Sequence, residues 1–335
     1  MPRKLRSDFA ALLAMTVSAA MPGAALADEG GVSFWLPGNY GSLAAVPGQP
    51  GWSFASVYYH TSVSAGGSRT FRIGGGVQAG LKGYADLVFL NGTYVSPTPF
   101  LGGQFSFDMT EAVGASNAGV NATLTGPLGN TLSGSRSDNV SGFSDLYPRA
   151  TVKWNEGVHN FMVYTMWGLP VGAYDPNRLA NIGIGHWSGD GGAGYTYFDP
   201  KTGHEFSAVA GLTYNFKNPY TNYQNGVDFH LDWAASQFLS KEWLVGVVGY
   251  FYNQISADSG AGATLGAFES RVAGIGPQVG YLFPAGDMQG YLNLKGYYEF
   301  DADHRPKGWN VWLTLAISPL PPTTAAQHQM ATRAR

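Results

Sequence analysis

The feature that most constrains the fold is an alternation of apolar and polar residues with a period of two. Over residues 287–301, Tyr291, Asn293 and Lys295 alternate with Leu292 and Leu294. A period of two places neighbouring side chains on opposite faces of a β-strand. Residues 146–154, 204–216, 227–237 and 309–317 repeat the pattern, and runs near 52–64, 84–95, 100–115, 158–170, 189–199, 242–256 and 269–283 are β-like. Together they predict about twelve strands, most reaching the roughly 9–11 residues that cross a bilayer when tilted.

The connections between these runs alternate strictly between short and long. Short turns rich in Pro, Gly, Asn and Asp lie at 96–99, 155–157, 199–203, 239–241 and 284–286. Long connections lie at 65–83, 116–142, 171–188, 217–224, 257–268 and 302–307. Outer-membrane barrels have short periplasmic turns and longer outer loops. The sequence therefore predicts an all-β fold, a transmembrane antiparallel up-and-down β-barrel with both termini in the periplasm.

The composition fits a barrel better than a soluble or helical membrane protein. Charged residues make up 12% of the chain, aromatic residues 14%, and the mean hydropathy is -0.08. An ordinary soluble domain carries about 25% charged residues, and a helical membrane protein is far more apolar. The chain has no cysteine, which excludes a disulfide scaffold, a thiolate metal site and a cysteine nucleophile. The net charge of -3 gives no reason to expect nucleic-acid binding.

The first 27 residues have the pattern of a secretory signal peptide. Basic residues at positions 3, 4 and 6 precede an apolar stretch over 9–20, and Ala25-Leu26-Ala27 forms a cleavage site before Asp28. Beyond it no apolar run approaches the ~18 residues of a membrane helix. We expect cleavage between Ala27 and Asp28 and a mature protein in the outer membrane of a Gram-negative bacterium.

Two segments lie outside the predicted barrel, which spans residues 52–318. Residues 28–51 are rich in Gly and Pro yet carry Phe34, Trp35, Leu36, Tyr40 and Leu43. A disordered tail has no need of these large apolar side chains. We expect this segment to fold back into the lumen as a plug, with a strap against the barrel rim as the alternative. Residues 319–335 have the composition of a disordered periplasmic tail.

Several segments of the mature chain resemble the meta-pathway phenol-degradation family of outer-membrane proteins, with its sphingosine-induced porin relatives. The resemblance is carried by residues 33–52 (SFWLPGNYGSLAAVPGQPGW), 57–66 (VYYHTSVSAG), 168–185 (GLPVGAYDPNRLANIGIG), 190–216, 272–283 (VAGIGPQVGYLF) and 287–300. It implies an outer-membrane barrel with a transport or channel role for small hydrophobic or aromatic molecules. It implies no catalytic residue.

The inner row of the predicted strands is the candidate functional surface. Selectivity in a barrel comes from lining charge, pore width and hydrogen bonding. We expect the following side chains to line the pore and contact solute: Tyr58, His60, Tyr147, Arg149, Lys153, Glu205, Asp228, His230, Asp232, Tyr250, Tyr252, Asn293, Lys295, Tyr297 and Glu299. Both charge signs are present, and the tyrosines suit amphipathic or aromatic solutes such as phenol-like or lipid-derived compounds. We expect a monomer in contact with outer-membrane lipid, with no catalytic residue, metal or cofactor.

Other chemistries have weaker support in the sequence. His230, flanked by Asp228 and Asp232, suggests a metal or acid–base site, or simply a polar lumen lining. Residues 175–178 (DPNR) suggest a calcium or phosphate contact, or a proline-fixed turn. An outer-membrane lipid hydrolase using His230 or His60 is the alternative function, although no Gly-x-Ser-x-Gly motif is present. A third possibility is a structural or adhesive barrel whose function lies in the connections 65–83 and 116–142.

Overall fold

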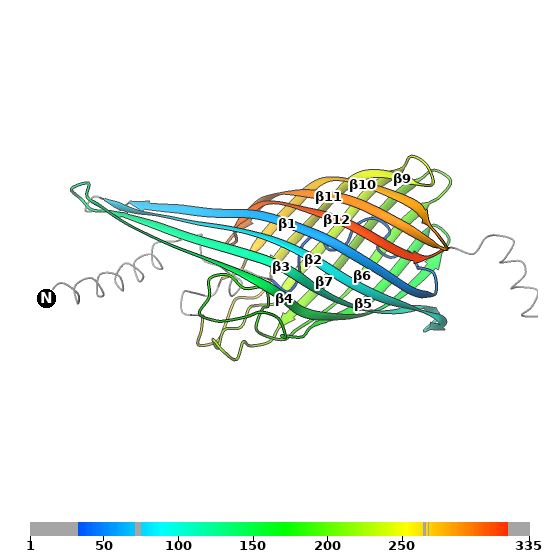
Figure 1. The fold of residues 1–335 in the computed structure, drawn as a ribbon, viewed down its shortest axis with the longest axis horizontal. Coiled ribbons are helices and arrows are strands. Elements are labelled where there is room, and N and C mark those ends of the chain that lie inside the picture. Colours follow the sequence, from blue (N-terminus) through cyan, green and yellow to red (C-terminus); the bar gives the residue numbers. More distant parts are fainter. Residues whose placement is uncertain (1–32, 71–74, 264–265, 267, 321–335) are drawn as a thin grey trace, which may run out of the picture.

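The computed structural model describes residues 33–70, 75–263, 266 and 268–320. They form one closed barrel of twelve antiparallel strands, in which each strand pairs with the next and β1 pairs with β12 (Figure 1). The strands are β1 (Gly51–Thr70), β2 (Gly76–Phe100), β3 (Gly103–Thr125), β4 (Thr131–Glu156), β5 (His159–Gly168), β6 (Ser188–Asp199), β7 (His204–Asn215), β8 (Asp228–Phe238), β9 (Trp243–Gln254), β10 (Arg271–Ala285), β11 (Met288–Asp303) and β12 (Lys307–Pro319).

The predicted fold class and strand number are confirmed. Within the described ranges, no helix is long and apolar enough to span a membrane. The predicted signal peptide, its cleavage site between Ala27 and Asp28, and the tail beyond residue 320 lie outside the described residues.

Three of the predicted long connections are wrong. The connection at 302–307 is reduced to residues 304–306, because β11 ends at Asp303 and β12 begins at Lys307. Most of 65–83 and 116–142 continues β1–β4, which project well beyond the other strands (Figure 1). These stretches are rich in Gly, Ala, Ser and Asn, which favour loops in a sequence reading. Here the ladder pairs them, as in Ala79 opposite Ala122 and Gly80 opposite Asn121. The turn expected at 96–99 falls instead at Leu101 and Gly102, both with positive φ.

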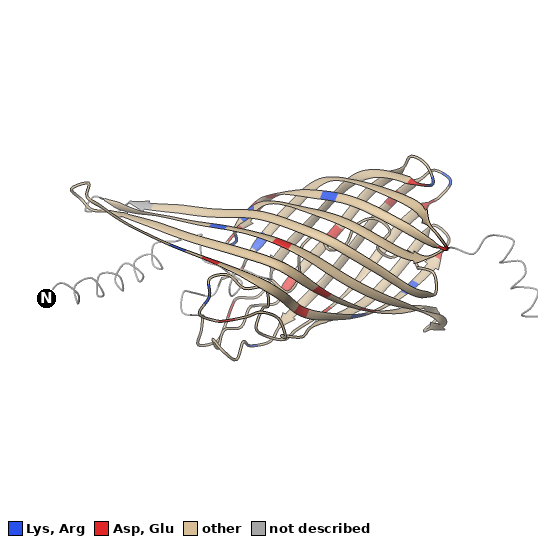
Figure 2. Cartoon of the chain, viewed as in Figure 1, with Lys and Arg blue, Asp and Glu red and all other residues tan. Residues whose placement is uncertain are grey.

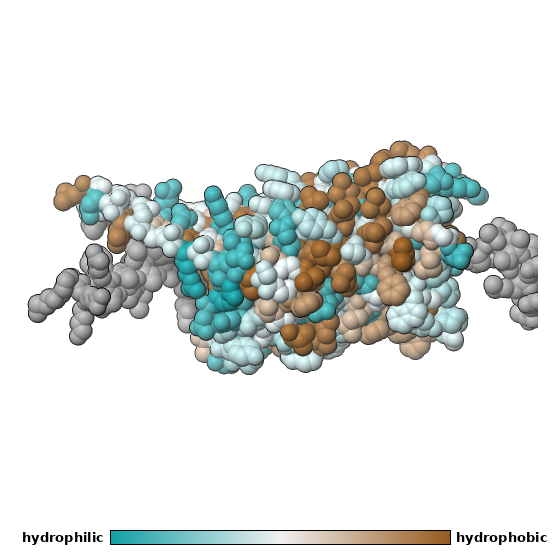
Figure 3. All heavy atoms as spheres, in the orientation of Figure 1, coloured by the Kyte–Doolittle hydropathy of each residue, from teal (hydrophilic) through white to brown (hydrophobic). Residues whose placement is uncertain are grey.

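The barrel wall is apolar on its outer surface. Exposed large side chains include Val163, Val247, Leu294 and Leu313, from four different strands. Figure 3 shows apolar residues gathered over the wall, and Figure 2 shows few charges there. The outward-facing residues of the projecting part of β1–β4 are small and polar. A lipid-facing apolar band and a polar projection are what an outer-membrane barrel presents to the bilayer and to water.

Residues 33–50, the luminal segment, lie inside the barrel (Figure 1). Phe34 and Trp35 are buried, at 5% and 1% exposure. Ser33 accepts a hydrogen bond from Arg305, which lies in the connection 304–306 between β11 and β12, at the same end of the barrel as the long β5–β6 connection. Gly48 hydrogen-bonds Gln104 beside the short β2–β3 turn. The segment therefore runs from the long-connection end of the barrel to the short-turn end, where β1 begins.

Candidate functional site in the barrel lumen

The centre of the luminal segment is held between a carboxylate and an ammonium group. Asp232, on β8, accepts hydrogen bonds from the backbone N–H groups of Gly38 and Tyr40, at 2.8 and 3.0 Å. Lys295, on β11, donates to the carbonyl oxygens of Gly38 and Tyr40, at 2.5 and 3.1 Å. Both side chains are nearly inaccessible to solvent. Because each charge satisfies backbone groups that would otherwise be buried unpaired, this clamp fixes the segment at a defined depth.

Next to the clamp, Trp35 stacks on His230. Their ring centroids are 3.6 Å apart and their planes differ by 13°. His230 is fully buried, and its Nε2 lies 2.9 Å from a carboxylate oxygen of Asp190 on β6. The carboxylate of Asp190 also accepts a hydrogen bond from the Thr213 hydroxyl. The imidazole is thus fixed from one side by β6 and covered on its face by the luminal segment.

Nearer the short-turn end the segment is bound by single contacts to several strands. The N–H of Leu43 donates to Glu205 at 2.9 Å, and the N–H of Ala45 donates to Thr196 at 3.0 Å. Lys153 donates to the carbonyl oxygen of Val46 at 3.2 Å. The segment is attached around the barrel rather than along one strand, so it divides the lumen.

Three cavities lie on the side of β1–β4. The mouth cavity, about 170 Å³, lies at the long-connection end between Tyr59, Leu81 and the connection after β5. The central cavity, about 260 Å³, shares Ser33, Leu36, Leu87 and Ile182 with it. The turn-side cavity, about 250 Å³, is lined by prolines of the luminal segment and of β2, and by Lys153. The mouth and central cavities adjoin each other, and the turn-side cavity lies at the short-turn end of the barrel.

A polar network separates the central and turn-side cavities. Arg149, on β4, donates through Nε to Asp108 at 2.9 Å and through a terminal nitrogen to the Tyr40 hydroxyl at 3.0 Å. Asn91 donates to Asp108 and Thr110. Burial raises the pKa of Tyr40 to about 12, so its hydroxyl is neutral at physiological pH. The guanidinium and carboxylate neutralise each other, so the network between the two cavities carries little net charge.

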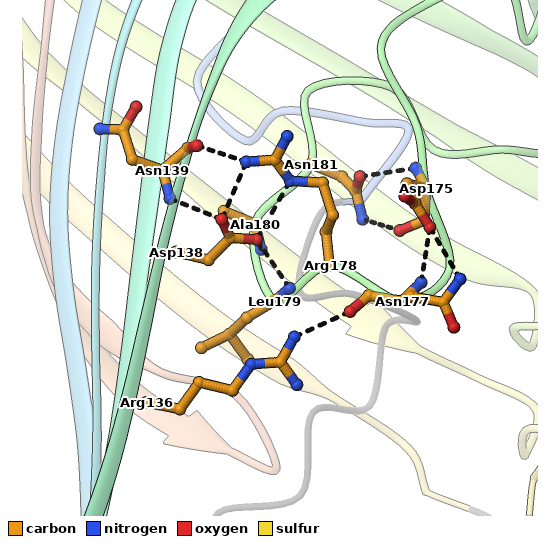
Figure 4. Close-up of polar contacts among 9 residues, drawn as sticks. All are labelled: Arg136, Asp138, Asn139, Asp175, Asn177, Arg178, Leu179, Ala180 and Asn181. Carbon is orange, nitrogen blue, oxygen red and sulfur yellow. Dashed lines mark hydrogen bonds and ion pairs between the residues drawn. The ribbon is translucent and has the colours of Figure 1, made fainter.

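The connection between β5 and β6 folds inward over the mouth cavity. Arg178 forms an ion pair with Asp138 of β4 at 2.8 Å, and the same carboxylate accepts from the N–H of Leu179 (Figure 4). The side-chain hydrogen bond between Arg178 and Asp138 raises the pKa of the Arg178 guanidinium above its ordinary value. Ala180 and Ile182 then pack on Val140. Residues 175–178 thus form a turn docked on β4, and the connection roofs the route.

Most of the side chains predicted to line the pore lie on the inner face of the barrel. Tyr58 and His60 do not, and for them the prediction was wrong. Tyr58 is 40% exposed on the outer face, and both side chains hydrogen-bond Asp86 on the same face. The run Val57-Tyr58-Tyr59-His60 has large side chains at both parities, so alternation does not decide which residues face inward. Tyr59 does so, with its ring 4.5 Å from that of Trp312.

The remaining predicted residues occupy two parts of the interior. Tyr147, Arg149, Lys153, Glu205, Asp232 and Lys295 surround the luminal segment. Tyr250, Tyr252, Tyr297 and Glu299 lie on β9 and β11, where Tyr250 donates to Glu299 at 2.8 Å and the Tyr297 ring lies beside Gly38; Asn293 bonds the Val279 carbonyl oxygen and Asp228 bonds Asn215. Sequence reasoning did not single out Phe89, Asp108, Met166 or Trp312. The alternation around Trp312 already put it on the inner side with Asn310.

The flanking carboxylates do not join His230 in one site. Its partner is Asp190, from a different strand, while Asp228 bonds Asn215 and Asp232 bonds the luminal segment. Among the described residues no group of three potential ligands is arranged to hold a metal ion. The His230–Asp190 pair fixes the imidazole on which Trp35 stacks, and the three residues of β8 at 228, 230 and 232 do not act together as one site.

A closed twelve-strand barrel with an apolar outer band and a polar, partly filled interior defines an outer-membrane β-barrel. The family model described as "Putative MetA-pathway of phenol degradation" matches residues 60–315, and the chain belongs to this family. The predicted family is therefore confirmed.

A solved outer-membrane channel shows the same fold. The COG4313 outer membrane channel from Pseudomonas putida F1 is 15% identical, covers 84% of this chain and 99% of its own, and has a TM-score of 0.58. The transport unit of the autotransporter AIDA-I from Escherichia coli is 11% identical, covers 82% and 91%, and has a TM-score of 0.37. A comparison with curated proteins finds no match.

Proposed function

We propose that this barrel is an outer-membrane channel for small hydrophobic or aromatic compounds and that the luminal segment is its internal restriction. The observation that carries the proposal is the series of cavities between that segment and β1–β4. A lumen that is partly filled and has a series of cavities along one side suits passage of small solutes past a fixed constriction. Membership of a family described by phenol degradation supports an aromatic solute.

The lining of the route suits solutes that are mostly apolar. Leu36, Val57, Leu87, Phe89 and Ile182 lie along the central cavity. Uncharged polar groups such as Asn91 and Thr110 are placed where a solute hydroxyl needs a partner. Ions and sugars gain little from such a surface. The proposal assigns no catalytic role to any residue, and it takes the protein to act as a monomer.

The orientation in the membrane is also part of the proposal. The short turns face the periplasm, and the projecting part of β1–β4 stands outside the membrane among the polar surface groups. Pro319, which pairs with Met288, then lies on the periplasmic side, as expected for the carboxyl end of the barrel. Ser33 lies at the opposite end of the barrel. In this orientation residue 33 is on the outer side of the membrane, although the amino-terminal end was expected in the periplasm.

Flux into proteoliposomes tests the function. Mature protein is incorporated into vesicles, and entry of phenol, glucose and potassium is compared with that into empty vesicles. Because phenol crosses lipid on its own, entry is followed over milliseconds with an entrapped phenol-oxidising enzyme. We expect a clear acceleration for phenol and little for glucose. Equal acceleration of all three would indicate an unselective pore, and acceleration of none would exclude transport of these solutes.

A further inference from the structure

The central cavity has walls from two different parts of the chain. Phe34, Leu36 and Asn39 come from the luminal segment, and the barrel supplies the opposite side. The centre of the segment is held from β8 and β11 by side chains that do not line the cavity, whereas Arg149, which does line it, contacts the Tyr40 hydroxyl. The segment presents the three named side chains to the open space.

Two aromatic pairs face this space. Phe34 lies 5.7 Å from Tyr147, centroid to centroid. Phe89 and Trp312 are 6.1 Å apart with an interplanar angle of 16°. Met166 lines the same cavity. Aromatic rings and a thioether offer a flat guest ring both stacking and edge contacts, and each aromatic pair adds stabilisation beyond the burial of area.

The size of the cavity is suited to a single ring. Its volume is about 260 Å³. An apolar cavity of about 150 Å³ inside a protein already accepts benzene. The remaining room accommodates a small substituent and one or two waters at the polar end.

The charge around the cavity selects against ionised guests. Among the residues that the structure describes, Arg149 is the only charged one that lines it, and that guanidinium is already engaged by Asp108 and by the Tyr40 hydroxyl. A carboxylate guest would compete with Asp108 at short range, and an ammonium guest would face a guanidinium. Asn39, which is exposed to the lumen, supplies an uncharged polar group on the segment side.

We propose that the central cavity is a binding site for a neutral monocyclic aromatic compound with a small uncharged polar group, and that the luminal segment forms half of that site. The segment is then a selectivity element as well as an obstruction. This inference rests on the proposed channel function, because the site lies on the proposed route. Beyond that function, it specifies the place where the solute is held and states that ionised analogues are rejected at this place.

Binding is measured on the mature protein in lipid nanodiscs by isothermal titration calorimetry, with empty nanodiscs as the blank. Phenol, benzoate and benzylamine are the probes at pH 7, where phenol is neutral and the other two are charged. We expect saturable binding of phenol, and at least tenfold weaker binding of benzoate and benzylamine. Benzoate or benzylamine binding as tightly as phenol would overturn the proposed neutral selectivity.

Two variants locate the site. Val57→Phe fills the central cavity from β1, and Phe34→Ala removes a ring contributed by the luminal segment. Each is expected to weaken phenol binding at least tenfold. Val163→Phe, on the outer face, is the matched control and leaves binding unchanged. Phe34 lies outside the strands, so its replacement leaves the barrel wall intact. Unchanged phenol binding in Phe34→Ala would show that the segment is not part of the site.

The two proposals fail in distinguishable ways. If vesicle flux of phenol is accelerated but the folded protein binds none of the probes, the channel stands and the binding site is wrong. If phenol binds with the expected variants but flux is not accelerated, the site stands and the channel is wrong.

Discussion

Asp232→Asn offers a direct way to measure how firmly the luminal segment is held. The carboxylate accepts two backbone hydrogen bonds, at 2.8 and 3.0 Å, from a site with 1% exposure. A hydrogen bond to a charged group contributes about 1.5–3 kcal/mol. Asparagine keeps the shape and one acceptor oxygen but turns an NH₂ group toward the second N–H. We expect docking to weaken by about 2–4 kcal/mol, which is roughly 30- to 800-fold in the opening equilibrium.

The assay is hydrogen exchange of the segment amides followed by mass spectrometry, since exchange of protected amides reports local opening. Leu43 and Ala45 N–H groups, which bond the wall independently of Asp232, should exchange faster by the same factor. Glu299→Gln is the control, because Glu299 is also buried and accepts from a backbone N–H, that of Gly308. Unaltered exchange in Asp232→Asn, or equal acceleration in Glu299→Gln, would refute the clamp.

Further perturbations test other contacts of the same structure. Gly38→Ala should speed hydrogen exchange of the segment amides at least several-fold, because φ at Gly38 is +89° and a Cβ would lie 2.9 Å from the Tyr297 ring. Gly41→Ala should leave exchange unchanged, because a Cβ there would lie 3.6 Å from the nearest atom. Raising the pH from 9 to 12 should loosen the segment, because the pKa of Tyr40 in the docked segment is raised to about 12. The neutral hydroxyl stabilises docking below about pH 10, and this contribution is lost as Tyr40 ionises. Tyr40→Phe should reduce this pH dependence, and an unchanged pH profile in the variant would contradict the reasoning. Val163→Arg, on the outer face, should cost about 2–4 kcal/mol in urea unfolding from lipid vesicles, while Ser137→Arg, on the exposed outer face of the projecting strands, should cost little.

Much of the barrel follows from local sequence pattern. Strands such as β5, β7 and β8 alternate cleanly because one face meets lipid and the other meets the polar interior. Strict alternation of connection lengths then ordered them into an up-and-down barrel. The projecting ends of β1–β4 were missed, because pairs such as Ala79 and Ala122 carry neither large apolar side chains nor a strong strand preference. Their strand structure depends on the neighbouring ladder.

The interior was less accessible to sequence reasoning for a different reason. Alternation tells which residues share a face but not which residues from distant strands meet. The pairing of His230 with Asp190, and the stacking of Trp35 on that imidazole, depend on the barrel register and on the path of the luminal segment. Tyr58 and His60 were predicted on the wrong face because residues 57–60 carry large side chains at both odd and even positions, so the pattern does not define an inner face.

Single-channel conductance measures whether the luminal segment restricts a pore that takes phenol. The mature protein is compared in planar bilayers with a variant lacking residues 28–50, which takes no strand away because β1 begins at Gly51. The account predicts a small conductance that phenol reduces further in the whole protein, and a larger conductance with little phenol effect in the shortened one. Equal conductance in the two proteins, with the same response to phenol, would contradict it.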